Sequence, residues 1–214
     1  MVQATDRERA AQWLNVSRET SAKLELYEDR LRKWQRVKNL IAPSTLDQIW
    51  TRHFADSQQI LAHARTADGY PKTWVDLGSG GGFPGMVIAI CLAGTDARVH
   101  LVESDHRKCA FLRDVARETQ APAVVHNLRI EDCYAAVGRV DMVTARALAP
   151  LWKLLDLAAP FIEDGAKCLF LKGQDVESEL TEATISSSLK VSLIESQVDP
   201  QGRLVAVHKA GLDQ

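Results

Sequence analysis

The stretch Trp74-Val75-Asp76-Leu77-Gly78-Ser79-Gly80-Gly81-Gly82-Phe83-Pro84-Gly85 decides the fold. Its apolar start predicts a buried strand, and four glycines follow within residues 78–82. The apolar run 86–93 then predicts a buried helix that begins at Pro84, because proline suits the first position of a helix. Glycine between a strand and a helix lets a ligand approach the backbone closely. The stretch therefore indicates a nucleotide-type ligand site on a strand–loop–helix unit.

The composition predicts one globular domain with an appendage. The chain has 214 residues, of which 46% are hydrophobic and 25% charged. A net charge of -2 argues against wholesale coating of a polyanion but leaves room for a local basic face. The four cysteines show no Cys-x-x-Cys spacing, so we expect reduced, mostly buried thiols and no metal site. Since no run resembles a signal peptide or a membrane span, we expect a cytoplasmic protein without a membrane partner.

Residues 1–70 predict a helical extension on the RNA or substrate side, and residues 71–214 a catalytic domain. One apolar stripe marks a helix in the extension: Leu24, Tyr27, Leu31, Trp34, Val37 and Ile41. Arg32, Lys33 and Arg36 lie opposite that stripe on a helical wheel. This basic face has two interpretations, a solvated outer surface or a phosphate-binding patch.

A second helix is expected after Pro43, which should end the first one. Residues 44–47 (Ser-Thr-Leu-Asp) resemble a capping box for its start. His53 and Asp56 are three residues apart and therefore share a face of this helix. They are either a structural pair that braces the helix or a pair with a role near the substrate.

After Pro71 the apolar pattern alternates between strands and helices. Strands are predicted over 73–77, 98–103, 123–127, 141–145 and 167–172, and helices over 84–93, 105–119, 150–159 and onward from Asp175. This alternation predicts an α/β fold with a parallel, doubly wound sheet. The runs 191–198 and 203–209, joined by the turn 199–202, predict a closing antiparallel hairpin.

Ligands of such sheets bind beyond the carboxyl ends of the strands, so the residues there suggest the ligand. Gly80-x-Gly82-x-x-Gly85 satisfies the dinucleotide fingerprint, but Asp76 would repel a pyrophosphate and would suit an ammonium or sulfonium group. S-adenosylmethionine fits this pattern better than NAD. In this interpretation Gly78 and Gly80 pass under its amino-acid part.

Three further residues complete the predicted cofactor site. Glu103 would accept hydrogen bonds from the ribose, and Ile130 and Glu131 would flank the adenine. Ile130 and Glu131 also have simpler explanations, since Ile130 suits a plain core position and Glu131, with Asp132, a solvated turn. Their positions after successive strands favour the cofactor interpretation.

Several motifs resemble a known family, the bacterial small-subunit ribosomal RNA guanine-N7 methyltransferase G, also called glucose-inhibited division protein B. The resemblance lies in Phe83-Pro84-Gly85 after the glycines and in four other segments: Arg52-His53-Phe54-Ala55-Asp56-Ser57, Leu101-Val102-Glu103-Ser104, Thr144-Ala145-Arg146-Ala147 and Leu171-Lys172-Gly173. It implies a Rossmann-like class I methyltransferase fold with a seven-stranded, mostly parallel sheet. It also implies methylation of N7 of guanine 527 in 16S ribosomal RNA.

The resemblance places cofactor contacts at Gly78, Phe83, Ile130, Glu131 and Arg146. Guanine N7 carries a free lone pair, so direct attack on the sulfonium methyl group needs no general base and none is assigned. Arg146, Lys172 and His53 are candidates to position the guanine or the RNA, although Arg146 could instead brace a strand end. Two other functions remain open, an NAD-dependent oxidoreductase and a non-catalytic RNA-binding module.

Overall fold

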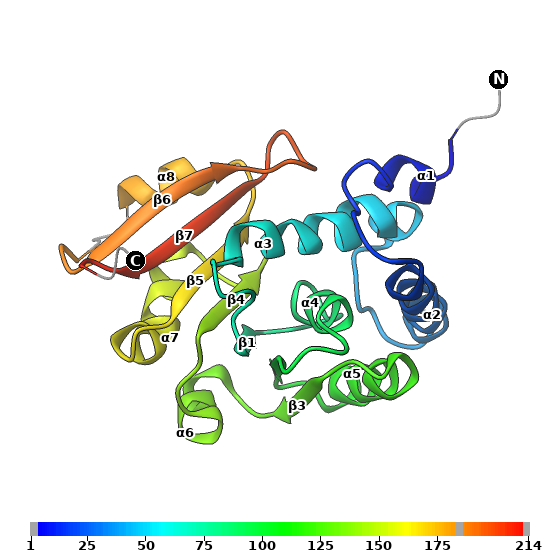
Figure 1. The fold of residues 1–214 in the computed structure, drawn as a ribbon, viewed down its shortest axis with the longest axis horizontal. Coiled ribbons are helices and arrows are strands. Elements are labelled where there is room, and N and C mark those ends of the chain that lie inside the picture. The colour runs from blue at the N-terminus through cyan, green and yellow to red at the C-terminus, as the bar shows by residue number, and fades with distance from the viewer. Residues whose placement is uncertain (1–3, 183–185, 212–214) are drawn as a thin grey trace.

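The computed structural model describes residues 4–182 and 186–211. Residues 1–3, 183–185 and 212–214 lie outside the described residues. The predicted ranges 1–70 and 71–214 are therefore described except for these residues. Seven strands form one sheet in the order β3-β2-β1-β4-β5-β7-β6, with helices on both of its faces (Figure 1).

The strands are β1 (Thr73–Leu77), β2 (Arg98–Glu103), β3 (Ala123–Asn127), β4 (Met142–Arg146), β5 (Lys167–Lys172), β6 (Leu189–Glu195) and β7 (Arg203–Lys209). The helices are α1 (Asp6–Ala10), α2 (Arg18–Gln35), α3 (Asp56–Ala64), α4 (Gly85–Cys91), α5 (His106–Thr119), α6 (Cys133–Val137), α7 (Leu151–Glu163) and α8 (Val176–Glu182). There are also two 3-10 helices, η1 (Pro43–Gln48) and η3 (Ile130–Asp132), and one π-helix, η2 (Ile49–Ala55), among the described residues.

The pairing confirms the predicted sheet. Strands β1 to β5 run parallel, while β7 pairs antiparallel with both β5 and β6. Strand β4 begins one residue later than the predicted 141–145, and β6 ends at Glu195, three residues before the predicted 198. The hairpin turn therefore spans residues 196–202.

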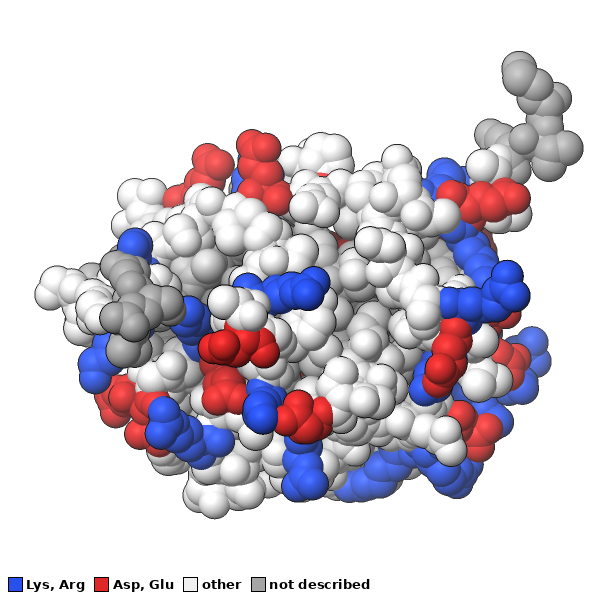
Figure 2. All heavy atoms as spheres, in the orientation of Figure 1, with Lys and Arg blue, Asp and Glu red and all other residues white. Residues whose placement is uncertain are grey.

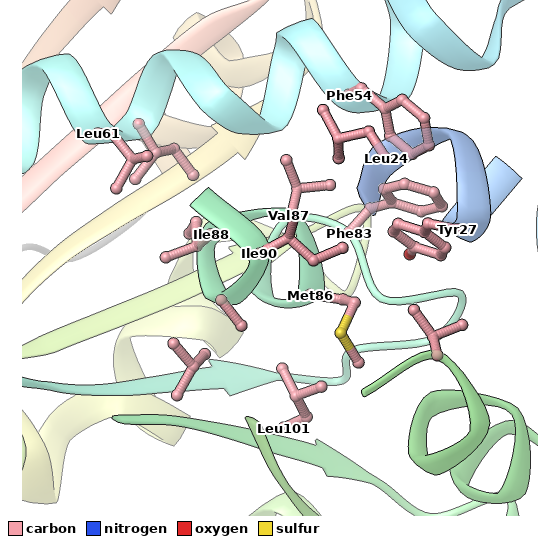
Figure 3. Packing of buried hydrophobic residues seen from close by; sticks show 14 of the residues in the cluster. Leu24, Tyr27, Phe54, Leu61, Phe83, Met86, Val87, Ile88, Ile90 and Leu101 are labelled. Carbon is pink, nitrogen blue, oxygen red and sulfur yellow. The ribbon is translucent and has the colours of Figure 1, made fainter. Parts of the chain in front are cut away.

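Two apolar clusters cover the two faces of the sheet. One contains Trp74, Leu101 and the buried side of α4 and α5, and it continues into the N-terminal helices through Leu24, Tyr27 and other residues. In Figure 3 the rings of Tyr27, Phe54 and Phe83 lie together beside Met86 and Val87. The other cluster lies under α6, α7 and α8. The N-terminal helices thus share one apolar core with the sheet.

The first predicted helix is shorter than the apolar stripe indicates. Helix α2 ends at Gln35, and Val37 is 74% exposed, so this part of the prediction is wrong. The Gln35 side chain explains the turn: its Oε1 accepts hydrogen bonds from the backbone N–H of Leu40 and Ile41, and its Nε2 donates to the Ile41 carbonyl. These bonds turn the chain after Gln35, eight residues before Pro43.

The predicted capping box after Pro43 is also wrong. Residue Ala42 precedes η1 without a side-chain cap, and the Thr45 hydroxyl donates to the Ala42 carbonyl instead of accepting from the helix. The chain continues through η2, a π-helix, before α3 begins at Asp56. A π-helix inside a helical segment often marks a functional site, because it redirects side chains.

No described helix has the length and apolar character needed to cross a membrane. Among residues 4–182 and 186–211, no group of three or more His, Cys, Asp and Glu side chains is arranged to hold a metal ion. The four cysteines are free thiols, three buried and Cys91 half-buried.

Candidate active site

A cavity of about 1010 Å³ opens at the carboxyl ends of the parallel strands. It lies where the sheet topology predicts a ligand. Nine of the ten residues predicted for the site line it: His53, Gly78, Gly80, Phe83, Glu103, Ile130, Glu131, Arg146 and Lys172. The tenth, Asp76, is absent from the lining.

The glycine loop after β1 owes its shape to the lack of side chains. Gly78 has φ +67°, and a Cβ there would lie 2.6 Å from Cδ1 of Leu148. At Gly82, with φ +92°, a Cβ would lie 2.8 Å from the Cβ of Met86. Gly80 also has a positive φ, but only the Gly78 carbonyl oxygen comes within 4 Å of its ideal Cβ, at 3.8 Å. Gly80 therefore leaves open space toward the cavity, as a cofactor cradle requires.

Asp76 lies behind this loop and not in the cavity wall. Side chains alternate along a strand, so Asp76 shares a face with Trp74, and that face is covered by α4. A Cβ on Gly85 of α4 would lie 2.6 Å from the Asp76 Cβ. Oδ1 of Asp76 accepts a hydrogen bond from the Thr144 hydroxyl at 2.8 Å, and this bond links β1 to β4. Complete burial raises the pKa of Asp76 to about 6, mainly by desolvation.

Glu103 holds the glycine loop in place. Its Oε2 accepts from the backbone N–H of Gly80 at 2.9 Å, and its Oε1 accepts from the backbone N–H of Asp105 at 2.8 Å. A carboxylate oxygen has a second lone pair, so these bonds leave room for a ligand hydroxyl. Ile130 and Glu131 follow β3 in η3 and face the same part of the cavity.

Arg146, the last residue of β4, is held by the η2–α3 segment. Its Nη1 donates to the Arg52 carbonyl at 2.9 Å and contacts Oδ2 of Asp56 at 3.3 Å, and its Nη2 lies 2.7 Å from Nδ1 of His53. The guanidinium stacks over the Phe83 ring at 5.0 Å. His53 and Asp56 are thus brought together, as their spacing predicts, and both brace Arg146.

The tautomer of His53 follows from its partners. An arginine N–H only donates, so Nδ1 of His53 accepts and Nε2 carries the hydrogen, which is donated to the Thr45 hydroxyl at 2.8 Å. Burial, with the nearby charges of Arg146 and Arg52, lowers the pKa of His53 to about 3. The ring is therefore neutral at physiological pH. Burial also raises the pKa of Asp56, while Arg146 opposes this effect.

Lys172, the last residue of β5, is also held by internal contacts. Its Nζ donates to the Ala149 carbonyl at 2.9 Å and pairs with Glu179 at 2.7 Å. The same Glu179 oxygen accepts from the backbone N–H of Leu151 at 2.7 Å. These bonds fix the segment 147–150, which places Leu148 against Gly78. Lys172 thus positions one wall of the cavity.

The predicted basic face is interrupted by acidic partners. Arg32 pairs with Glu28 at 2.8 Å and Lys33 with Asp29 at 2.5 Å, each one helical turn away. Figure 2 shows basic and acidic side chains next to each other over α2 and α5. Arg36 lies beyond the end of α2 and lines a separate hollow with Lys38 and Lys108.

The sequence missed other residues of the cavity wall. Leu148, Asp199 in the hairpin turn and Arg203 at the start of β7 line it. Their only sequence signal is a position near the end of a strand, which does not mark them as residues of the site. Gln59, which is buried in α3, holds the turn 196–202 from behind and gave no signal at all.

The fold is shared with solved methyltransferase structures. TrmN from Thermus thermophilus has a TM-score of 0.55 at 17% identity and covers 75% of this chain and 53% of its own. An rRNA methylase from Streptococcus thermophilus has a TM-score of 0.54 at 14% identity, with 74% and 96% covered. The chain therefore has the Rossmann-like fold of class I methyltransferases, as the sequence predicts.

Sequence similarity narrows this class. The family model for rRNA small subunit methyltransferase G (GidB) matches residues 20–203. A relative of that name from Nitrobacter hamburgensis is 50% identical over 208 residues, which are 96% of this chain and 78% of the relative. Another, from Methylobacterium radiotolerans, is 46% identical over 202 residues, 94% of both chains. The chain belongs to the rRNA small subunit methyltransferase G family.

Proposed function

We propose that this protein transfers the methyl group of S-adenosylmethionine to N7 of guanine 527 in 16S ribosomal RNA. The observation that carries the proposal is the family match over residues 20–203, which contain every residue predicted for the site. The resemblance in the motifs around Phe83 and Arg146 supplies the particular guanine.

The cavity suits the cofactor in size and in chemistry. Pockets for ligands of this size measure about 300–1000 Å³, so a cavity of about 1010 Å³ also leaves space for a base. In our proposal the amino-acid part lies along Gly78 and Gly80, where the backbone is open. Glu103 accepts from the ribose, and Ile130 and Glu131 flank the adenine. Phe83 and Arg146 form the wall beside the methyl group.

Bound S-adenosylmethionine supplies an electrophilic methyl group. Guanine N7 needs no deprotonation, so the residues of this chain have to bind, orient and exclude water. His53 agrees with this mechanism, because its Nδ1 is already engaged by Arg146 and its lowered pKa keeps it neutral. We therefore assign the acceleration to proximity and orientation, and no proton transfer to any side chain.

We further propose that residues 1–70 form the RNA side of the molecule and that the protein works in the cytoplasm. A guanine in a single-stranded loop enters a cavity more easily than one stacked in a helix. Among the basic residues predicted to hold RNA, Arg36 is the one we favour, since Arg32 and Lys33 are paired with acids.

Incubation of small ribosomal subunits with the protein and labelled S-adenosylmethionine tests the proposal. We expect one methyl group on guanine 527, located by mass spectrometry of nuclease fragments and by cleavage chemistry specific for N7-methylguanine. Absence of transfer, on both subunits and free 16S RNA, would favour the non-catalytic RNA-binding module. Calorimetric titration with NAD provides the other comparison, because tight NAD binding without S-adenosylmethionine binding would favour the oxidoreductase.

A further inference from the structure

The strand order divides the cavity into two halves on either side of β1. The ends of β1, β2 and β3 carry the glycine loop, Glu103 and the segment 130–131. The other side of β1 carries Arg146 on β4, Lys172 on β5 and the hairpin turn 196–202. Because the cofactor is proposed to occupy the first half, the second half is left for the target base.

The turn 196–202 presents Asp199 to this second half in a fixed conformation. The Ser196 hydroxyl accepts from the backbone N–H of Val198 at 3.2 Å and of Asp199 at 3.1 Å. Oδ1 of Asp199 accepts from the backbone N–H of Gln201 at 3.0 Å. A Cβ on Gly202 would lie 3.1 Å from Cβ of Ser196 and 3.2 Å from Cβ of Asp199, so the turn closes tightly on itself.

Gln59 of α3 fixes this turn relative to Arg146. Its Oε1 accepts from the backbone N–H of Gln197 at 3.0 Å and lies 3.3 Å from the Ser196 hydroxyl. Its Nε2 donates to Oδ1 of Asp56 at 2.8 Å, and Asp56 contacts Arg146. The amide nitrogen also lies 3.1 Å from the Ser196 hydroxyl, so the oxygen is fixed by the Gln197 N–H and the nitrogen by the Asp56 carboxylate. Gln59 is 3% exposed, so water does not replace these bonds.

Four carboxylates line the cavity: Asp56, Glu103, Glu131 and Asp199. Asp56 is bound by Arg146 and Gln59, and Glu103 by two backbone N–H groups. Glu131 lies in the cofactor half. Asp199 accepts one backbone N–H at Oδ1, and its Oδ2 comes only within 4.0 Å of Arg52, the longest ion pair among the described residues. Its side chain is 44% exposed, and both oxygens keep a free lone pair. It is therefore the acid of the second half that remains available to a ligand.

Guanine offers a partner for such a carboxylate. Its N1–H and its N2 amino group are neighbouring donors on the Watson–Crick edge, and two carboxylate oxygens accept both together. This edge lies across the ring from N7, so a guanine whose N7 faces the methyl group directs N1 and N2 away from it. We propose that Asp199 selects guanine by accepting from N1–H and N2–H, an inference that rests on the proposed methylation of guanine N7.

Replacement of the target guanine by inosine tests this contact. Inosine keeps N7 but lacks the N2 amino group, and it can be placed at the target in 16S RNA joined from two pieces and assembled into subunits. A bidentate contact discriminates by about 5-fold to 150-fold. We expect wild-type protein to methylate the guanine substrate with a kcat/KM about tenfold above the inosine substrate. We expect Asp199→Asn to lower kcat/KM for guanine and to bring the ratio close to one.

Two further variants separate selection from mere support of the fold. Gln59→Leu keeps the carboxylate but releases the turn, so we expect it to lower the guanine-to-inosine ratio while S-adenosylmethionine binds with unchanged affinity. Gln58→Leu, the neighbouring change on the same helix, and Asp68→Asn, on an exposed turn, should both keep the wild-type ratio.

The outcomes distinguish the two proposals. If wild-type protein methylates guanine and inosine equally, or if Asp199→Asn keeps the wild-type ratio, Asp199 does not read the base and the methylation proposal stands. If wild-type protein methylates neither substrate, the methylation proposal fails and the role of Asp199 falls with it.

Discussion

The two halves of the cavity are built in different ways. The cofactor half is shaped by missing side chains, since Gly78 and Gly82 allow neighbouring atoms to approach within distances that any Cβ would forbid. The half beside β4 and β5 is shaped by hydrogen bonds between distant residues. Arg146 bonds to Arg52 and His53 across 94 and 93 positions, and Gln197 bonds to Gln59 across 138.

The difference teaches where each half is vulnerable. A backbone fit fails at single glycine positions, because an added side chain has no space. A side-chain network fails when one member loses its donor or acceptor and leaves the others unpaired in a buried place. The first kind of failure removes ligand affinity, and the second alters which ligand is accepted.

The largest effect is expected from Gly78→Asp, which breaks the cofactor half alone. A residue with φ +67° costs about 1–2 kcal/mol, and its Cβ, which would lie 2.6 Å from Cδ1 of Leu148, requires the end of the Leu148 side chain to move. We expect S-adenosylmethionine affinity to fall by more than about 100-fold, measured by calorimetry, with RNA affinity unchanged.

The matched control for this variant is Gly94→Asp. Gly94 also has a positive φ of 88°, but no atom lies within 4 Å of its ideal Cβ and it does not line the cavity. Its cofactor affinity should equal that of the wild type. Normal cofactor binding by a folded Gly78→Asp variant would contradict the cavity assignment.

The second-largest effect is expected in the pH dependence of stability, from the buried carboxyl group of Asp76 behind the glycine loop. Burial raises the pKa of Asp76 to about 6, above its ordinary value of 3.8, so the folded protein holds this proton more tightly than the unfolded chain. The stability gained is present below about pH 4 and is lost as the pH rises through about 6. Relative to Asp76→Asn, the free energy of unfolding of wild-type protein should fall by about 3 kcal/mol between pH 4 and pH 8.

Urea unfolding of both proteins across this pH range measures the difference. Asp47→Asn, which removes a carboxylate from the exposed side of η1, serves as the control and should follow the wild-type curve. Parallel curves for wild type and Asp76→Asn would show that Asp76 keeps an ordinary pKa and is not desolvated as the structure indicates.

The smallest effect is expected from Arg36→Ala, which touches neither half of the cavity. Each phosphate contact contributes about 0.7 to the slope of log K against log salt for single-stranded RNA. We expect Arg36→Ala to reduce that slope by about this amount and to lower RNA affinity about threefold at moderate salt. Lys33→Ala should change less, because Asp29 already neutralises Lys33. Filter binding over a salt series measures both variants. Equal losses of RNA affinity in Arg36→Ala and Lys33→Ala would indicate that the whole predicted basic face binds RNA.

The sequence predicts which residues line the half proposed for the cofactor, because the determinants of that half are local. Strand, glycines and helix follow one another, and Glu103, Ile130 and Glu131 each follow a strand. The position of Asp76 was harder to predict, because the direction of its side chain depends on which face α4 covers. The ends of α2 and the start of η1 were missed, since Gln35 turns the chain through bonds that no apolar pattern records.

The base half was predicted only in part. Arg146 and Lys172 were found because both end strands, but their partners were not. The turn 196–202 reaches the cavity because Gln59 lies beneath it, and such a contact between residues far apart in the chain has no periodicity. The apolar alternation and the spacing of the strands therefore predict which strand ends lie next to each other. They do not predict which side chains form hydrogen bonds between those ends.

The packing of α2 against the glycine loop has a consequence for synthesis on the ribosome. The Tyr27 hydroxyl donates to the Gly81 carbonyl, and the Tyr27 ring stacks on Phe83 at 5.4 Å. Because α2 precedes the loop in the chain, it leaves the exit tunnel first. The partner of the loop is thus already outside the tunnel when residues 78–82 emerge, so the contacts of Tyr27 with Gly81 and Phe83 do not have to wait for any later segment of the chain.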